Sequence, residues 1–278
     1  MDVASAGPMT SAPLVALVFI VLAALVVEAA LGFGATVIAV ALGAFFYPID
    51  VLLPAYVPVN MVLSAYLVLR HRDGVDGRFL LRRIVPFMAL GLPAGLLLFR
   101  YSSGPLLKAL FGVFVVALSA MELLRLGRAA RAAGATPQGP GDGPGSDDGA
   151  PPRPTVRPLA TAPAAVLLCL GGVIHGAFGT GGPMAVYVAG RQLTDKRVFR
   201  STLSALWLLL NGVLVVTYAL GGYLTVRSAK LSLVMLLPLA VGTVIGEWTH
   251  RRLKGRTFAT LVFVVLLVAG LALALRSR

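Results

Sequence analysis

The chain has 278 residues, of which 58% are hydrophobic and only 13% are charged, and its mean hydropathy is +0.90. This composition is too apolar for a soluble domain and is typical of a protein that crosses a membrane several times. The formal net charge of +13 would favour nucleic acid as the partner of a soluble protein, but here the Lys and Arg residues lie in loops between apolar runs. We therefore interpret them as residues that orient the chain in a membrane, and we expect no nucleic acid partner.

Apolar runs of near-spanning length follow one another along the whole chain and predict an all-α polytopic membrane protein. They cover residues 13–30, 51–69, 84–99, 106–124, 162–173, 203–220, 231–245 and 258–275. The first run lacks the preceding basic stretch of a secretory signal peptide, so we expect it to remain in the protein. Cys169 is the single cysteine and lies in an apolar run, so we expect no disulfide, thiolate metal site or cofactor.

A polar segment interrupts these runs between residues 125 and 157, with the sequence "RLGRAARAAGATPQGPGDGPGSDDGAPPRPTVR". A segment rich in Gly, Pro and Asp cannot bury enough apolar surface to fold, which predicts a disordered linker. We therefore expect a first transmembrane repeat over residues 1–126, a cytoplasmic linker over 127–158 and a second repeat over 159–278.

An internal repeat relates the two halves. Residues 32–35 (Gly-Phe-Gly-Ala) match residues 177–180 (Ala-Phe-Gly-Thr) at an offset of 145, and Asn60 matches Asn211 at an offset of 151. At the second offset a Gly-x-x-x-Gly pair also recurs, as Gly91 and Gly95 and as Gly242 and Gly246. Paired asparagines and ordered glycine pairs rarely coincide by chance in apolar sequence, so we interpret the halves as repeats.

The basic residues then favour an inverted relation between the repeats. Four simple crossings in each half would divide the densely basic loops between the two sides of the membrane. If segments 13–47 and 162–190 instead enter the membrane, break at their glycines and return, 18 of the 24 Lys and Arg residues fall on one side, which is then cytoplasmic. We therefore expect both termini outside, and two inverted repeats, each with a Gly-broken hairpin and three transmembrane helices, as in many secondary transporters.

The breaks themselves predict an anion site, because a helix interrupted in a membrane exposes backbone groups that need a partner. At the second break Thr180 can cap or donate, Gly181 and Gly182 can present amide N–H groups, and Pro183 suits the first turn of a helix. The repeat-related amides of Asn60 and Asn211 can also donate to an anion. The expected substrate-binding residues are Gly32, Phe33, Gly34, Thr36, Asn60, Phe178, Gly179, Thr180, Gly181, Gly182, Pro183 and Asn211. The alternatives are that the glycines serve only close helix packing and that the asparagines only join helices.

Two ionisable residues lie near the breaks and are candidates for proton coupling. Glu28 lies four residues before Gly32 and His175 lies four before Gly179, so each shares a helix face with a glycine of its break. Protonation of His175 would add a positive charge beside an anion, whereas an ionised Glu28 would repel one. The alternatives are a buried histidine with a satisfied hydrogen bond and a carboxylate that pairs with a loop near the membrane surface.

The motif "GAFGTGGPMAVYV" at residues 176–188, with the weaker "EAALGFGATVIAV" at residues 28–40, resembles the sulfite exporter TauE/SafE family. The resemblance covers both halves and implies a small permease that moves sulfite, sulfonates or related small organic anions, often outwards.

We therefore expect an exporter in the inner membrane of the cell, with a small anion, protons and membrane lipid as partners and with the choice between monomer and homodimer open. A passive anion channel, a structural subunit and a membrane enzyme are the alternatives. The sequence offers no catalytic constellation, so we expect no enzyme.

Overall fold

The computed structural model describes residues 11–31, 33–102, 104–134, 160–250 and 255–276, and every regular element in these ranges is a helix. The predicted all-α class is therefore confirmed. The α-helices are α1 (Ser11–Leu31), α2 (Ala35–Gly43), α3 (Ile49–Arg70), α4 (Gly77–Phe79), α5 (Val85–Tyr101), α6 (Gly104–Gly134), α7 (Thr161–Phe178), α8 (Gly182–Ala189), α9 (Lys196–Leu220), α10 (Val226–His250) and α11 (Gly255–Arg276). A 3-10 helix, η1 (Arg72–Gly74), and a π-helical turn, η2 (Leu80–Ile84), connect α3 to α5.

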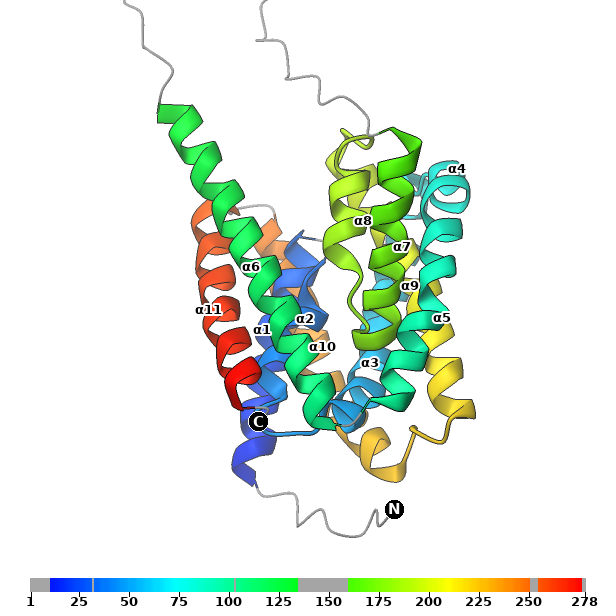
Figure 1. Cartoon of the computed structure of the whole chain (residues 1–278), viewed down its shortest axis with the longest axis vertical. Coiled ribbons are helices and arrows are strands. Elements are labelled where there is room, and N and C mark those ends of the chain that lie inside the picture. Colours follow the sequence, from blue (N-terminus) through cyan, green and yellow to red (C-terminus); the bar gives the residue numbers. More distant parts are fainter. Residues whose placement is uncertain (1–10, 32, 103, 135–159, 251–254, 277–278) are drawn as a thin grey trace, which may run out of the picture.

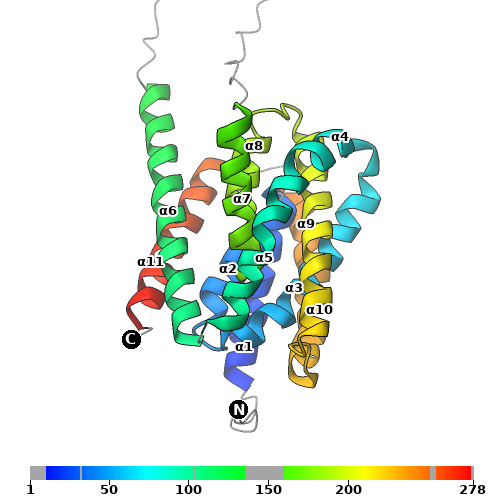
Figure 2. The same cartoon turned by 45° about the vertical axis from the view of Figure 1, so that its right-hand side comes forward.

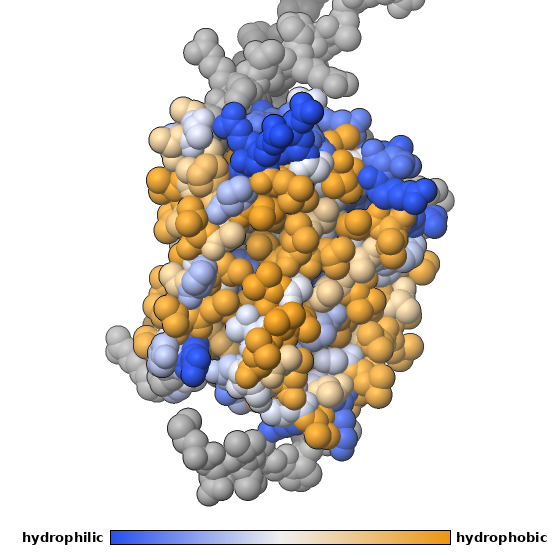
Figure 3. Space-filling view, turned by 90° about the vertical axis from the view of Figure 1, so that its right-hand side faces the viewer, coloured by the Kyte–Doolittle hydropathy of each residue, from blue (hydrophilic) through white to orange (hydrophobic). Residues whose placement is uncertain are grey.

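Seven of the described helices are long and apolar enough to cross a membrane, namely α1, α3, α4 to α5 as one unit, α6, α7, α9 and α10. Helix α11 adds a shorter apolar stretch, Val262–Leu275. Each apolar run predicted from the sequence lies on one of these helices. On the face shown in Figure 3, apolar side chains form a broad band, while hydrophilic side chains gather towards the two ends. The fold is that of a polytopic membrane protein.

The chain reverses direction at two breaks, between α1 and α2 and between α7 and α8. Helices α1 and α2 run antiparallel, because Gly43 at the end of α2 lies beside Leu17 near the start of α1. Figure 1 shows that α7 and α8 form a second hairpin, which enters the bundle from the other end. We call the end at which α6 ends and α7 begins the linker end, and the opposite end the far end.

Four helix pairs make the most extensive contacts between the two halves: α5 with α7, α1 with α10, α3 with α9 and α6 with α11 (Figures 1 and 2). Helix α3 also contacts α10. The repeat-related glycine pairs form two of these contacts. A Cβ on Gly91 or Gly95 of α5 would collide with backbone carbonyl groups of α7, and a Cβ on Gly242 or Gly246 of α10 would crowd backbone carbonyl groups of α1. These four glycines therefore permit close approach of helices.

Helix α6 continues to Gly134, so residues 127–134, which were predicted to belong to the disordered linker, are helical. The local sequence is rich in Ala and Arg, which are strong helix formers, and the Gly/Pro-rich composition begins only afterwards. Residues 135–159, and the termini at 1–10 and 277–278, lie outside the described residues. The described chain starts and ends near the far end (Figure 1).

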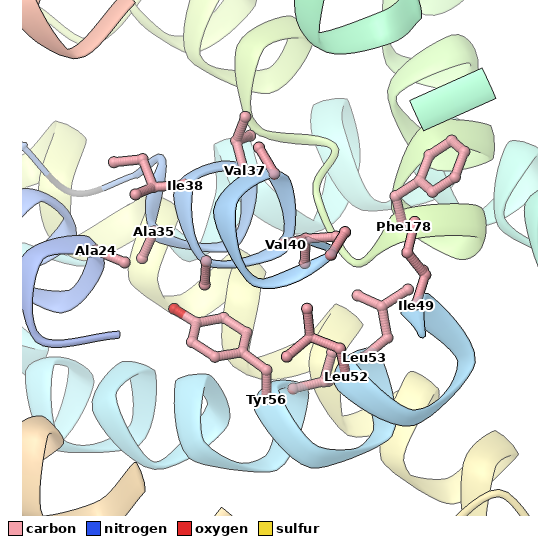
Figure 4. Close-up of a cluster of buried hydrophobic side chains, with 14 of the residues drawn as sticks. Ala24, Ala35, Val37, Ile38, Val40, Ile49, Leu52, Leu53, Tyr56 and Phe178 are labelled. Carbon is pink, nitrogen blue, oxygen red and sulfur yellow. The ribbon is translucent and has the colours of Figure 1, made fainter. Parts of the chain in front are cut away.

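The short helix α2 is enclosed by the core, with eight of its nine residues buried. Figure 4 shows Leu52, Leu53 and Tyr56 of α3 packed near Val40 of α2, with Phe178 of the second break nearby. Helix α8 has one buried face, which includes Ala185, Val188 and Ala189. Both returning helices are thus held inside the bundle, which fixes the position of the breaks.

Candidate functional site

The first break brings the side chain of Glu28 to the start of α2. Gly34 has φ of +103° and precedes the helix, a conformation that L side chains rarely adopt. The backbone N–H of Ala35, the first residue of α2, donates a hydrogen bond to the Glu28 carboxyl group. Glu28 is 4% exposed, so it is not a carboxylate at the surface. Gly32 lies outside the described residues.

The second break has a corresponding arrangement around His175. Gly179 has φ of +64° and ends α7, and Gly181 precedes α8. The backbone N–H of Gly181 donates to Nδ1 of His175 at 3.2 Å. A Cβ on Gly181 would collide with the carbonyl oxygen of Gly171, so this position requires glycine. At each break a buried side chain thus accepts a hydrogen bond from the start of the returning helix.

His175 keeps a free donor inside the protein. Because Nδ1 accepts a hydrogen bond, we assign the proton of the neutral ring to Nε2. Nε2 is buried and has no hydrogen-bond partner among the described residues. The ring stacks on Trp207 of α9 with 6.0 Å between centroids and 14° between planes, which fixes its orientation. The predicted alternative, a histidine with its hydrogen bonds satisfied, holds only for Nδ1.

The two repeat-related asparagines are hydrogen-bonded to each other. Nδ2 of Asn211 donates to Oδ1 of Asn60 at 2.9 Å, and Nδ2 of Asn60 donates to Oε2 of Glu28 at 2.9 Å. The hydroxyl oxygen of Tyr56 lies 3.4 Å from the same Nδ2 atom of Asn60. Oδ1 of Asn211 is buried without a partner in the described part of the chain. The asparagines therefore do join α3 to α9, as the alternative predicted, but they also connect α9 to the carboxyl group of the first break.

The two breaks are in contact with each other. A Cβ on Gly182 would lie 4.0 Å from Cβ of Phe33, and one on Gly179 would lie 3.6 Å from Cγ2 of Thr36. Between them lies a cavity with an empty volume of about 270 Å³. We call it the central cavity; its lining residues are Glu28, Phe33, Gly34, Thr36, Asn60, His175, Gly179, Thr180, Gly182, Trp207 and Asn211.

Three predicted site residues do not line this cavity. Phe178 instead packs with Phe111 and Phe114 of α6, at centroid distances of 5.0 and 6.4 Å. Gly181 acts through its N–H group on His175, and Pro183 lines a neighbouring cavity. Trp207 was missed, although it lies four residues before Asn211 and therefore on the same face of α9.

The neighbouring cavity has an empty volume of about 590 Å³ and shares Phe33, Gly34, Thr180 and Gly182 with the central cavity. It extends between α2 and α8 towards α6 and α11 and is mostly apolar. Its acidic residue, Glu122, was not anticipated and lies 3.6 Å from the guanidinium group of Arg125. The central cavity thus continues into a larger space on one side.

The central cavity is polar but contains no Lys or Arg side chain. Its positive potential comes instead from the N-terminal ends of α2 and α8. Its hydrogen-bond donors are the His175 Nε2–H and Asn211 Nδ2–H groups and the hydroxyl groups of Thr36 and Thr180. Such a site can bind a small anion by hydrogen bonds without forming an ion pair.

Comparison with known proteins gives one finding that covers nearly the whole chain. The family model described as "Sulfite exporter TauE/SafE" matches residues 16–273. No curated protein and no solved structure matches the chain. The match spans both halves, both breaks and every residue that lines the central cavity, and the chain therefore belongs to the sulfite exporter TauE/SafE family.

Proposed function

We propose that the protein is a proton-coupled secondary transporter that exports sulfite, organosulfonates or related small anions from the cell. The observation that carries this proposal is the central cavity, in which two broken helices and one asparagine from each half surround a small polar space. Family membership supports transport of sulfite or a related anion. The cavity supports the small size of that anion.

Recognition of the anion rests on donors from the second half. A sulfite or sulfonate group presents three oxygen atoms, which can accept from His175 Nε2–H, from the Nδ2–H of Asn211 that Asn60 does not use, and from the Thr180 hydroxyl group. Burial strengthens these hydrogen bonds because water does not compete for the donors. The site therefore favours a small anion with several oxygen atoms.

Proton coupling rests on Glu28. An ionised Glu28 would repel an anion in the same small cavity, whereas a protonated Glu28 would not. The Asn211–Asn60–Glu28 hydrogen-bond chain connects the carboxyl group to the donor that binds the anion. Binding of the anion and protonation of Glu28 therefore favour each other in this mechanism.

The inverted-repeat arrangement is also part of the proposal. The pairings α1 with α10 and α5 with α7 exchange equivalent helices between the halves, while α3 with α9 and α6 with α11 pair equivalent helices directly. A two-fold relation between the repeats produces this set of pairings. Alternating access follows if one set of helices rocks against the other around the breaks.

Buried aromatic side chains lie on the far-end side of Asn60 and Asn211. Tyr56 precedes Asn60 by one helical turn, and Tyr218 of α9 contacts Phe99 and Tyr223 at centroid distances of 5.3 and 6.2 Å. Tyr56 and Tyr218 are fully buried. We place the far end outside and the linker end in the cytoplasm, so that the basic side chains at the linker end follow the positive-inside rule.

Transport in proteoliposomes with imposed pH gradients tests the function. We expect sulfite flux to follow the proton gradient, and sulfite to raise the melting temperature of the purified protein. Asn211→Leu should abolish the thermal shift, whereas Ser119→Ala, which alters a buried hydroxyl group outside the cavity, should retain it. Flux that ignores the pH gradient would identify a passive channel instead.

The orientation has its own test. Replacement of Cys169 alone gives a cysteine-free background, and α6 offers two glycines, Gly104 near the far end and Gly127 near the linker end, at which an added Cβ meets nothing within 4 Å. We expect Gly104→Cys to react with an impermeant thiol reagent in intact cells and Gly127→Cys to react only after permeabilisation. The reverse result would overturn the proposed orientation.

A further inference from the structure

A second hollow lies at the linker end, between the end of α3 and the start of α9. It has an empty volume of about 1060 Å³ and shares no residue with the central cavity. Its lining residues are Arg70, His71, Lys196, Arg197, Arg200, Ser201 and Glu247. We call it the basic hollow.

Arg200 is the unusual member of this set. Its Nε and Nη2 atoms are buried and have no hydrogen-bond partner among the described residues. Burial of these two charged nitrogen atoms without a hydrogen-bond partner is unfavourable. Structures rarely retain such a group unless something else binds to it.

The charges around Arg200 do not balance. Arg70, Lys196 and Arg197 add three further positive charges, while Glu247 alone is acidic in the lining. Glu247 lies 3.8 Å from Arg70 and 3.9 Å from His71 rather than beside Arg200.

His71 does not add to this excess at neutral pH. Burial and, after it, the nearby Arg200 charge lower the pKa of His71 from 6.5, and the Glu247 charge only partly opposes them. The histidine is therefore mostly uncharged, and the basic hollow keeps an excess of about three positive charges from its lining side chains.

The start of α9 lies at the same place, but its first N–H groups are already used. Asp195 caps the helix by accepting from the N–H groups of Arg197 and Val198, at 2.7 and 3.0 Å. Ser201 in the second turn also lines the hollow. The donors that remain for an anion are therefore on side chains, above all on Arg200.

We propose that the basic hollow is a second anion site, which binds a tetrahedral oxyanion of charge −2 against Arg200. A planar guanidinium group whose Nε and Nη2 atoms have no partner matches two oxygen atoms of such an anion, and two negative charges offset most of the local excess. Arg200 precedes Asn211 by about 16 Å of helix, so this site and the central cavity are separate. Inorganic sulfate or phosphate and the phosphate of an anionic lipid headgroup have the same chemistry.

Titration of the purified full chain with inorganic sulfate, in phosphatidylcholine nanodiscs, tests the proposal by calorimetry. Arg200→Gln should weaken sulfate binding by at least about tenfold, as expected for loss of a charged hydrogen-bond partner. Arg82→Gln makes the same change of charge at an exposed residue of η2 outside the hollow and should change the affinity less than about twofold. Equal affinities of these two variants, or no sulfate binding by the parent chain, would overturn the proposal.

Two further variants separate this site from folding and from the central cavity. Without sulfate, Arg200→Gln should melt no lower than the parent, because it removes an unpartnered buried charge. If that variant fails to fold, Lys196→Gln alters an exposed residue of the same hollow and should weaken sulfate binding several-fold. Asn211→Leu should leave calorimetric sulfate binding at the hollow intact, and loss of all binding in Asn211→Leu would assign the sulfate to the central cavity.

Competition identifies the source of the oxyanion. In the same nanodiscs, short-chain phosphatidic acid should displace sulfate more effectively than glycerol 3-phosphate if a lipid headgroup is the natural occupant. Equal displacement by the two compounds indicates a soluble oxyanion. Displacement by chloride at the same concentrations would show that the hollow only attracts charge, and it would overturn the proposed tetrahedral site.

Discussion

The two breaks share one geometry but differ in chemistry. In each, a buried side chain accepts a hydrogen bond from the first residues of the returning helix, at Ala35 in the first half and at Gly181 in the second. The first break uses the carboxyl group of Glu28, which can change its charge, and the second uses His175, whose Nε2–H group remains free. The repeat therefore supplies the scaffold, while each half contributes a separate chemical group to the shared cavity. We infer that the first break handles the proton and the second binds the anion.

Glu28→Gln should have the largest effect, because it removes the proposed proton-binding group of the first break. Glutamine keeps the size of the side chain and can still accept hydrogen bonds from Ala35 and Asn60, but it cannot ionise. We expect sulfite flux driven by a pH gradient to fall to background, while the sulfite-dependent rise in melting temperature persists. Proteoliposome flux and thermal unfolding measure the two quantities, and undiminished gradient-driven flux would exclude Glu28 as the coupling group.

Asn60→Leu should have the largest effect on stability, because it severs the hydrogen-bond connection between Glu28 of the first break and Asn211 of α9. It leaves Glu28 Oε2 and Asn211 Nδ2 without their 2.9 Å partners, at a cost of about 1–3 kcal/mol for each buried group. We expect a clear drop in melting temperature. The double variant Asn60→Leu/Asn211→Leu should be less destabilised than the sum of the single variants, and strict additivity would contradict a coupled pair.

His175→Asn tests whether the second break binds the anion through the Nε2–H group of His175. The Asn Oδ1 atom can replace Nδ1 as the acceptor for Gly181 N–H, but the free donor at Nε2 is lost. We expect sulfite affinity to fall about tenfold, as for loss of one hydrogen bond to a charged group, with little change in melting temperature. Calorimetric titration with sulfite measures this, and unchanged affinity would remove His175 from the anion site.

Gly34→Ala and Gly179→Ala should have the smallest effects. Both positions have positive φ, so an L side chain costs about 1–2 kcal/mol at each. Gly127→Ala in the helical part of α6 is the matched control and should instead stabilise by about 0.5–1 kcal/mol. Melting temperatures of the three variants, compared with the parent chain, test this difference.

The sequence predicted the helices and both breaks because apolar length and clustered glycines are local features. It also predicted most of the central cavity, since the repeat aligned Gly34 with Gly179 and Asn60 with Asn211. It did not predict that Asn60 and Asn211 touch, because that contact depends on how α3 packs against α9. Phe178 shows the same limit, since only packing places it against α6 rather than in the cavity.

Arg200 illustrates a different limit. From the sequence it was one of many basic residues that orient the chain in the membrane, and nothing local separates it from Arg197. The burial of its Nε and Nη2 atoms results from the way η1 and the end of α3 pack on α9, where a Cβ on Gly74 of η1 would lie 2.9 Å from Oγ of Ser201.

The hydrogen bond between Asn60 and Asn211 limits which side chains these two positions can carry. Under the proposed two-fold relation, residues on the axis meet their own equivalents, so a side chain there must complement itself. An amide satisfies this condition because it both donates and accepts, whereas two carboxylates would repel each other. At the offset of 145, Glu28 corresponds to Val173 and His175 corresponds to Ala30, so neither ionisable side chain has to complement a copy of itself in the other half.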